Sequence, residues 1–329
     1  MKVSVIIPVY KVENTIEKCL RSVASQNFPG CLECLVVDDA SPDTSMERAR
    51  AFIDNCGARV EWRVLTHERN KGLSEARNTG ISAATGDYLY FLDSDDEITP
   101  DCIAGLAAMA ERHPGVDIVQ GNLVVTDVRY RCYDIRQYNF PEFTEDYDWI
   151  LHHMLTDIPV MAWGRLIRRR WLVDNGLTFM PGILHEDEYW RYQAADKVES
   201  IAFCSEPSYV YYVTPGSITN AGAKDRSYAS MIRVFSDYIP NVAEEWMWRY
   251  MLMYLSEARM YPERMNDPAK FESAFLEFVG KAIKHGRMPA WARRAYSYVL
   301  KPSALKRMWY AIFHRRTYRL LRRLGEPPF

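Results

Sequence analysis

The chain is constrained most by a regular alternation over its first hundred residues. Short β-branched or apolar runs alternate with segments whose apolar residues recur every three or four positions, the patterns of buried strands and amphipathic helices. The expected strands lie at 3–7, 34–37, 60–65 and 88–92, and the helices at 13–25, from 41 onward, and at 74–84. Such alternation predicts an α/β fold with a mainly parallel sheet flanked by helices.

The later chain is less regular. A helix is expected at 100–112, a strand at 116–125, and an irregular aromatic stretch at 126–148. Further on, a helix is expected near 149–155, and from about residue 226 the pattern is helical. The sequence therefore predicts an α/β region followed by a helical extension.

Polar residues follow three of the four early strands at the point where each strand ends. They are Pro8-Val9-Tyr10, Asp38-Asp39 and Asp93-Ser94-Asp95-Asp96. Ligands of open parallel sheets bind at the carboxyl ends of the strands. We therefore expect these loops to line one cleft.

Three of these residues, Asp93, Asp95 and Asp96, crowd carboxylates into a span of four positions. Their mutual repulsion is costly unless a cation compensates, and hard oxygen ligands suit Mg²⁺ or Mn²⁺. A solvated acidic turn or a helix cap is the alternative. Because these carboxylates follow directly after an expected strand, we favour a metal site over an acidic turn or a helix cap.

Two further loops carry candidate ligand groups. Asp39 could accept an N–H from a nucleobase, or the loop could simply cap a helix through Ser41 or Asp43. Lys71 and Arg77 lie near an expected helix start, which favours a diphosphate. Within that turn Gly72 allows close backbone approach, although the chain contains no P-loop pattern.

Charge is distributed unevenly along the 329 residues. The net charge is −2, but the segment from residue 281 to the end carries about +12, which leaves residues 1–280 near −14. Arginines interleave with aromatics in that tail, as in a helix lying on an anionic membrane surface. A helix that packs on the acidic body or between subunits is the alternative, whereas nucleic-acid binding lacks a supporting motif.

Two absences narrow the class of protein. No apolar stretch approaches the ~18–20 residues of a spanning helix, so we expect no integral membrane segment. The seven cysteines are irregularly spaced, and Cys31-x-x-Cys34 lies in an apolar run, so buried free thiols in a reducing cytosol are expected.

Taken together, these motifs resemble those of family 2 glycosyltransferases, over about residues 1–220. The resemblance rests on the segments 8–13, 36–43, 70–78 and 91–96, in that order and spacing. Later counterparts are Ala162-Trp163-Gly164-Arg165-Leu166, Glu186-Asp187, and Tyr211-Tyr212 followed by Gly216-Ser217-Ile218. In this chain Ala40 replaces a glycine that is frequent in the family, a mild departure, and Gly164 replaces a larger polar residue.

The resemblance implies a GT-A fold and an inverting, metal-dependent reaction. It is to those family members that build bacterial surface polysaccharides. It implies a catalytic domain over 1–225, with a nucleotide-binding half at 1–115 and an acceptor half at 116–225, and a basic helical region at 226–329. Asp187 would be the catalytic base. Asp95 and Asp93 would hold Mn²⁺ or Mg²⁺ in an Asp-x-Asp motif. The donor nucleotide would be bound by Pro8, Val9, Tyr10, Glu13, Asp39, Asn70, Lys71, Gly72, Arg77, Asp93 and Ser94, and the acceptor by Trp163, Glu186 and Asp96.

The expected reaction moves a hexosyl or N-acetylhexosaminyl group from a nucleotide sugar, by default a UDP-sugar, to a hydroxyl of a saccharide or lipid-linked saccharide. A cytoplasmic enzyme is expected, peripheral at the inner face of the plasma membrane if residues 281–324 bind anionic lipid, and a homo-oligomer is left open. The alternatives are a sugar-nucleotide nucleotidyltransferase, disfavoured because residues 8–11 contain no glycine, and a non-catalytic nucleotide-sugar-binding protein at the membrane.

Overall fold

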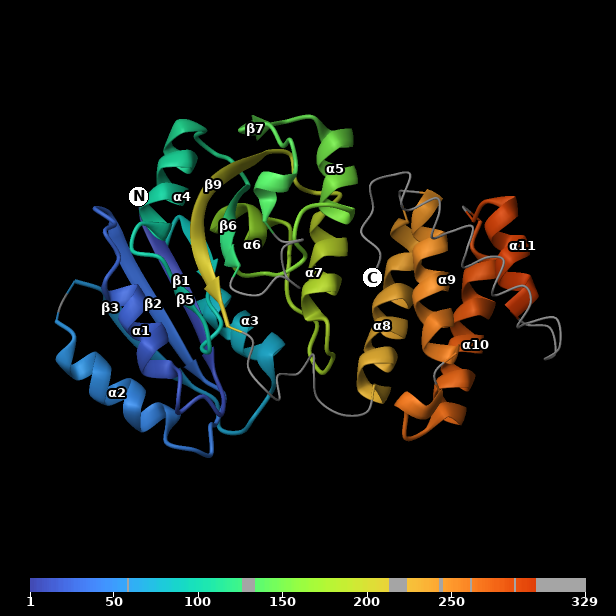
Figure 1. Cartoon of the computed structure of the whole chain (residues 1–329), viewed down its shortest axis with the longest axis horizontal. Helices are drawn as coiled ribbons and strands as arrows, with labels where there is room; N and C mark the ends of the chain where they lie inside the picture. Colours follow the sequence, from blue (N-terminus) through green and yellow to red (C-terminus); the bar gives the residue numbers. More distant parts are fainter. Residues whose placement is uncertain are drawn as a thin grey trace. The chain divides into compact units, whose positions relative to one another are not determined.

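The computed structural model describes residues 1–57, 59–125, 134–212, 224–242, 245–260, 262–286 and 288–299 (Figure 1). Most of the basic tail, and the Gly216-Ser217-Ile218 segment, therefore lie outside the described residues. The chain forms two compact units. The first comprises Met1–Gly182 and Glu186–Ser217, and the second comprises Ile183–His185 and Ile218–Phe329.

The first unit is built on one mixed sheet. Its strands are β1 (Lys2–Val9), β2 (Cys31–Asp38), β3 (Glu61–Thr66), β4 (Tyr88–Phe91), β5 (Glu97–Ile98), β6 (Ile118–Val125), β7 (Phe143–Thr144), β8 (Arg165–Arg168) and β9 (Ile201–Tyr211). In the described residues the order is β3-β2-β1-β4-β8-β6-β9-β5, and β7 pairs with β9. Strands β1 to β4 pair in parallel, while β8 is antiparallel to both β4 and β6.

Helices cover this sheet. They are α1 (Ile16–Ala24), α2 (Ser45–Asn55), α3 (Leu73–Ala83), α4 (Cys102–Arg112), α5 (Tyr147–Leu155), α6 (Arg169–Asp174) and α7 (Glu186–Ala194), with a short 3₁₀ turn η2 (Ile135–Gln137). Helix α3 packs on β1 and β2, and α4 packs on β6, β8 and β9. The early strand–helix alternation is thus confirmed, and the fold is the expected α/β arrangement.

The core lies at the centre of the sheet. Seven of the eight residues of β1 and of β2 are buried, which explains their nearly continuous apolar sequence. Strand β9 was not predicted. Its eleven residues include Ser205-Glu206-Pro207 at exposed positions, so the apolar run that marks a central strand is interrupted there.

The second unit is helical. Helices α8 (Asp225–Tyr238), α9 (Glu245–Met260), α10 (Pro268–Lys284) and α11 (Ala290–Val299) run side by side, with the 3₁₀ turns η3 (Ile239–Asn241) and η4 (Pro262–Arg264) (Figure 1). Phe235, Phe275, Phe278 and Tyr296 are almost fully buried. The Tyr296 hydroxyl donates to the Trp248 carbonyl at 2.6 Å. These contacts make α11 a member of the helical bundle.

Of the two closely spaced cysteines expected to be buried, only one is buried. Cys34 is buried but Cys31 is exposed, because Cys31 is the first residue of β2; both are free thiols.

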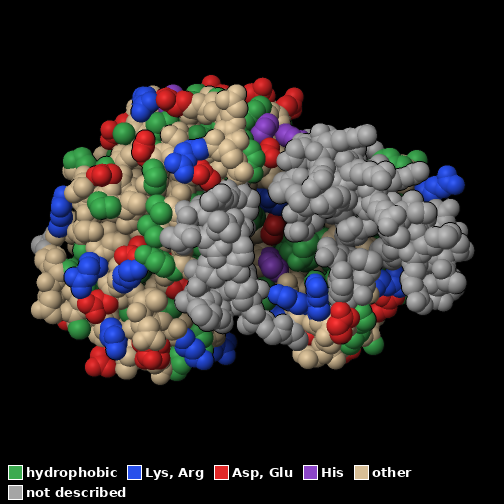
Figure 2. Space-filling view, in the orientation of Figure 1, with side chains coloured by type: hydrophobic (Ala, Val, Ile, Leu, Met, Phe, Trp, Pro, Cys, Tyr) green, Lys and Arg blue, Asp and Glu red, His purple; other side chains and the backbone are tan. Residues whose placement is uncertain are grey.

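Among the coloured side chains on the face in Figure 2, acidic and basic groups are interspersed. The excess acid of residues 1–280 is therefore not gathered into one patch on that face. No helix among the described residues is long and apolar enough to span a membrane.

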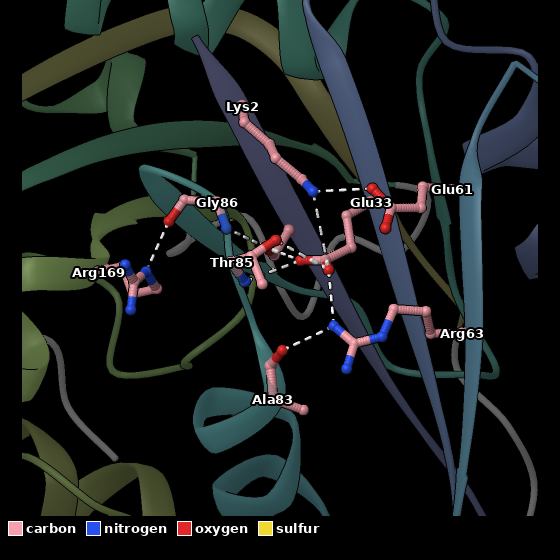
Figure 3. Close-up of polar contacts among 9 residues, drawn as sticks. Lys2, Glu33, Glu61, Arg63, Ala83, Thr85, Gly86 and Arg169 are labelled. Carbon is pink, nitrogen blue, oxygen red and sulfur yellow. Dashed lines mark hydrogen bonds and ion pairs between the residues drawn. The ribbon is translucent and has the colours of Figure 1, made fainter.

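A buried carboxylate joins the strands near their amino ends (Figure 3). The side chain of Glu33 is fully buried, and it accepts hydrogen bonds from the Ser4 hydroxyl at 2.5 Å, the Thr85 N–H at 2.9 Å and Arg63 Nη1 at 2.8 Å. Burial alone would raise the pKa of Glu33, but these donors hold it at about 2. Lys2 lies 3.9 Å away and binds Glu61 at 2.8 Å. This cluster ties together β1, β2, β3 and the turn between α3 and β4.

Candidate active site

The carboxyl ends of β2, β1 and β4 lie next to one another in the sheet. Val9 pairs with Asp38, and Ile6 pairs with Phe91. The Asp39 N–H also donates to the Val9 carbonyl at 3.0 Å. The loops that follow these strands therefore begin at one edge of the sheet, where Tyr10 is 40% exposed.

Asp39 organises the loop that leads into α3. Its carboxylate is buried and accepts the N–H groups of Lys71 and Gly72, each at 2.8 Å. The same carboxylate lies 2.7 Å from Nδ1 of His67, whose Nε2 lies 2.8 Å from Thr79 Oγ1. Gly72 has a φ of 92°, a backbone conformation that would be strained for any residue with a side chain. Asn70 and Lys71 are exposed on this ordered loop.

Glu13 acts on the neighbouring loop. Its carboxylate accepts from the Thr44 hydroxyl at 2.7 Å and from the Thr44 N–H at 3.2 Å, just before α2. In the same loop Ala40 has a φ of 55°, in the left-handed region. An alanine there costs about 1 kcal/mol relative to glycine. Replacement of the family glycine by Ala40 is therefore a strained change, not the mild one expected from the sequence.

Arg77 joins three carboxylates that are distant in sequence. The guanidinium is 1% exposed, and Nη2 donates to Asp93 at 2.9 Å. Nη1 donates to Glu186 at 2.9 Å and to Asp187 at 2.8 Å. Burial alone would lower the pKa of Arg77, but the three carboxylates raise it above its usual value. Arg77 therefore stays charged and fixes the start of α7 against the end of β4.

Asp187 lies in the first turn of α7 and is partly accessible, with 20% of its side chain exposed. Burial raises the pKa of Asp187 to about 7, Arg77 opposes this rise, and the charges of Glu186 and Asp93 add to it. A carboxylate whose pKa lies near neutral pH is suited to general-base chemistry.

The acidic turn after β4 contains carboxylates in two different environments. Asp96 is buried, and it accepts from the Tyr209 hydroxyl at 2.6 Å and the Tyr212 N–H at 2.8 Å. Burial and the charges of Asp93 and Asp95 raise the pKa of Asp96 to about 8. Asp93 keeps 26% of its side chain exposed and Asp95 is half-buried, while Ser94 is buried. Asp96 thus anchors β9, and Asp93 and Asp95 are the more accessible pair.

A divalent cation fits the composition of this turn. No group of three or more potential metal ligands is formed within the described part of the chain. Two hard carboxylates at Asp93 and Asp95 nevertheless match Mg²⁺ or Mn²⁺, which usually keep water or phosphate oxygens as further ligands. The charges of Asp93 and Asp95 also add to the rise that burial causes in the pKa of Asp96, as expected for carboxylates crowded into one turn.

Trp163 lies behind the acidic turn. It is 6% exposed and stacks on Tyr209 at 4.0 Å between ring centroids, and on Tyr211 at 5.8 Å. Since Tyr209 in turn binds Asp96, these rings support the turn from within the fold. Gly164 has a φ of 76°, so the backbone favours glycine here whatever the acceptor requires.

The structure also brings in residues absent from the predicted site. Asn78 and Phe179 exchange two hydrogen bonds, of 2.8 and 2.9 Å, and the Phe179 ring faces Arg77 at 5.2 Å. His67 and Tyr209 hold Asp39 and Asp96. Asn78 belongs to a motif quoted above, but the other three are isolated aromatic or histidine residues, which no spacing in the sequence marks.

With this geometry established, comparisons with known proteins identify the class. The fold resembles that of Staphylococcus aureus TarS residues 1–349, with a TM-score of 0.67 at 21% identity, covering 99% of this chain and 92% of that one. The fold is thus of the GT-A glycosyltransferase type. The model of Glycosyl transferase family 2 matches residues 4–170.

Curated relatives agree with this assignment. The glycosyltransferase EpsJ of Bacillus subtilis is 30% identical over 305 residues, which cover 86% of each chain. Glycosyltransferase GlyA of Streptococcus pneumoniae is 32% identical over 233 residues, 66% of this chain but only 31% of GlyA. The chain belongs to glycosyltransferase family 2 and is a glycosyltransferase.

Proposed function

We propose that this enzyme transfers a sugar from a UDP-sugar, with inversion, to a hydroxyl of a saccharide or lipid-linked saccharide in cell-surface polysaccharide synthesis. The observation that carries the proposal is the Arg77 bridge. It holds Asp187, a partly exposed carboxylate with a pKa near 7, beside Asp93 of the acidic turn.

In this reaction Asp187 accepts the proton of the acceptor hydroxyl as that oxygen attacks the anomeric carbon of the donor. The bond from the anomeric carbon to the diphosphate oxygen breaks, and the nucleoside diphosphate leaves from the opposite face. One displacement inverts the configuration without a covalent intermediate. Arg77 keeps Asp187 oriented and favours its ionised form.

Asp93 and Asp95 would hold Mn²⁺ or Mg²⁺. When bound, this ion supplies Lewis-acid stabilisation of the departing diphosphate. The exposed Lys71 lies on the loop before α3, where its charge favours the same diphosphate. Tyr10, Glu13 and the Asp39 loop form the nucleoside side of the donor site, with Asp39 acting mainly by fixing the Lys71-Gly72 backbone.

The donor assignment draws on similar structures. TarS has been crystallised with UDP and with UDP-GlcNAc, at TM-scores of 0.65 and 0.66 to this chain. A mannosyltransferase from Pyrobaculum calidifontis, in complex with GDP-Man and Mn²⁺, is less similar at a TM-score of 0.54. The uridine nucleotides of the more similar TarS structures support the proposed UDP-sugar, and the Mn²⁺ of the mannosyltransferase complex supports the proposed divalent metal.

A thermal-shift panel tests donor and metal together. The protein is heated with UDP-glucose, UDP-galactose, UDP-N-acetylglucosamine or GDP-mannose, each with MnCl₂ or with EDTA. A ligand at ~100 times its dissociation constant stabilises by about 2.7 kcal/mol. We expect one UDP-sugar to raise the melting temperature only when Mn²⁺ is present. Stabilisation by GDP-mannose alone, or equal stabilisation in EDTA, would refute the donor or the metal assignment respectively.

We further propose that the enzyme works at the cytoplasmic face of the membrane through its basic tail. Residues 290–299 form α11 and pack in the bundle, so lipid contact is proposed for residues 300–324, outside the described residues. Co-sedimentation with anionic vesicles should distinguish the full chain from a version ending at Val299, which keeps α11. Equal binding by both would refute the tail proposal.

A further inference from the structure

His185 stands immediately before α7 in an unusual backbone conformation. Its φ is 62°, and only Lys11 and Ala40 share a positive φ among the non-glycine residues that the structure describes. Lys11 and Ala40 follow β1 and β2 on the proposed donor loops, whereas His185 precedes the proposed catalytic base by two residues. Such conformations are disfavoured outside glycine and persist only where the surroundings hold them.

The surroundings of His185 are supplied by α8. Nε2 of His185 lies 2.7 Å from the Ser227 hydroxyl. One residue earlier, the Leu184 N–H donates to the Ser230 hydroxyl at 2.9 Å, and that hydroxyl donates to the Arg226 carbonyl at 2.8 Å. Because Ser227 and Ser230 are three residues apart, they lie on one face of α8. Residues 183–185 accordingly belong to the second compact unit.

The next two residues are held by a different partner. Glu186 and Asp187 both accept hydrogen bonds from Arg77. Four consecutive residues, 184–187, are therefore fixed by side chains on either side of the His185–Glu186 peptide bond. Asp187 therefore follows, two residues later, a backbone that α8 contacts at Leu184 and His185, and its own carboxylate is held by Arg77.

We propose that His185 is a positioning residue for the base, and that α8 of the helical unit acts on catalysis through it. The His185–Ser227 contact holds the left-handed backbone from which α7 starts, and Leu184–Ser230 fixes the preceding peptide. This proposal rests on the proposed role of Asp187. Since a misplacement of about 1 Å can reduce a rate by about 10²-fold, loss of these contacts acts on turnover more than on donor binding.

Hydrogen exchange tests the positioning directly and needs no donor. Glycine adopts a positive φ freely, so His185→Gly removes the ring without opposing the backbone conformation. Ser227→Ala removes the partner hydroxyl, and Ser236→Ala is the matched control, because the Ser236 hydroxyl donates only to Ile232 within α8 among the contacts described. We expect the hydrogen-bonded amides of α7, at 190–194, to exchange about fivefold faster in His185→Gly and Ser227→Ala, and at the wild-type rate in Ser236→Ala.

Kinetics then separate positioning from a loss of fold. With UDP-N-acetylglucosamine or UDP-glucose and Mn²⁺, release of UDP should show kcat reduced at least about tenfold in His185→Gly and Ser227→Ala, with the donor KM within about twofold. The double variant should be no slower than His185→Gly, because the contact removed by Ser227→Ala is already lost in His185→Gly. His185→Asn, which tolerates a positive φ and keeps a hydrogen-bonding group, should recover part of the activity.

Two outcomes separate a failure of the positioning role of His185 from a failure of the proposed base, Asp187. If exchange and turnover in His185→Gly and Ser227→Ala match those of Ser236→Ala, the positioning role is wrong while Asp187 can still be the base. If instead Asp187→Asn retains full turnover, the proposed function of Asp187 fails, whatever the exchange rates show.

Discussion

Two clusters of buried charge, at opposite ends of the same parallel strands, are built in opposite ways. At the amino ends a single carboxylate, Glu33, receives hydrogen bonds from Ser4, Thr85 and Arg63. At the carboxyl ends a single guanidinium, Arg77, serves three carboxylates, and its Nε finds no hydrogen-bond partner within the described residues. Donors are in excess in the first cluster and acceptors in the second.

The carboxylates of the two clusters also differ in pKa: donors lower that of Glu33, whereas burial is the main cause of the rise at Asp187. That of Glu33 is lowered from 4.5 to about 2, so its contribution to stability is present above pH 4.5 and is lost as pH falls through 2. That of Asp187 is raised from 3.8 to about 7, so its contribution is present below pH 3.8 and is lost as pH rises through 7. At neutral pH the first cluster stabilises the fold, whereas the second holds a poorly compensated carboxylate ready to accept a proton.

The largest expected effect comes from the proposed base. Asp187→Asn keeps the size of the side chain but cannot accept the acceptor proton, so turnover should fall about 10³- to 10⁴-fold. Initial rates of UDP release measure this, and a donor-induced thermal shift like that of the wild type confirms that the donor still binds. Asp174→Asn, at an exposed position on α6, is the control. A loss below tenfold would remove Asp187 from the mechanism.

Arg77→Lys should have the next largest effect. An ammonium cannot reproduce the two-pronged contact with Asp93 on one side and Glu186 and Asp187 on the other, so we expect kcat to fall about 10²-fold. Arg170→Lys, whose guanidinium is 84% exposed, is the matched control. Wild-type turnover in Arg77→Lys would show that a positive charge at this position is sufficient and that the two-pronged geometry of the guanidinium is not required.

Glu33→Gln should affect stability and leave catalysis intact. The amide turns an N–H₂ group toward donors, which leaves a buried group unpaired and costs about 2–3 kcal/mol. Denaturant unfolding at pH 7 measures the loss, and kcat at 25 °C should stay within about twofold of wild type. Glu61→Gln, which changes an exposed carboxylate near the same cluster, is the comparison. Equal stability of the two variants would contradict the role assigned to Glu33.

The pH dependence gives a smaller effect. Since Asp187 must be ionised to accept a proton, kcat should rise with pH and level off above its pKa of about 7. Between pH 6 and pH 8 the increase should be about tenfold. Rates measured in one buffer series at constant ionic strength test this, and a flat profile over that range would mean that Arg77 keeps the carboxylate ionised throughout.

The smallest expected effect is at Ala40. Ala40→Gly should stabilise the protein by about 0.5 kcal/mol, because relief of the left-handed strain exceeds the added freedom of glycine in the unfolded chain. Chemical denaturation measures the difference. Ala51→Gly, on the exposed face of α2, is the control and should destabilise the protein instead.

The strand–helix order and the loops that follow β1, β2 and β4 could be predicted, because both depend on short stretches of sequence. An apolar run that is followed by Asp39 or Asp93 already implies a strand and the edge of the sheet at which the next loop begins. The contacts of Arg77 could not be predicted in this way. Its motif suggested a diphosphate ligand, but its partners Glu186 and Asp187 are 109 and 110 residues away, and no periodicity links such positions. The family match itself ends at residue 170, before either acid.

Strand β9 and residues such as His67, Phe179 and Tyr209 were missed for a related reason. Their importance arises from which side chains they meet, and this is decided by packing. Tyr209 is fully buried against Asp96 and Trp163, but in the sequence it is one of 21 tyrosines.

The separation of Arg77 from its partners also has a consequence during synthesis. A ribosome releases the segments for β1 to β4, with Arg77 and Asp93, long before residues 186 and 187 leave the exit tunnel. Until then Arg77 has only Asp93 among its three described acid partners. A nascent chain of that length contains the residues proposed for the donor site but lacks Asp187, the proposed base. In the proposed mechanism, sugar transfer therefore requires a contact between residues more than a hundred positions apart, whereas donor binding does not.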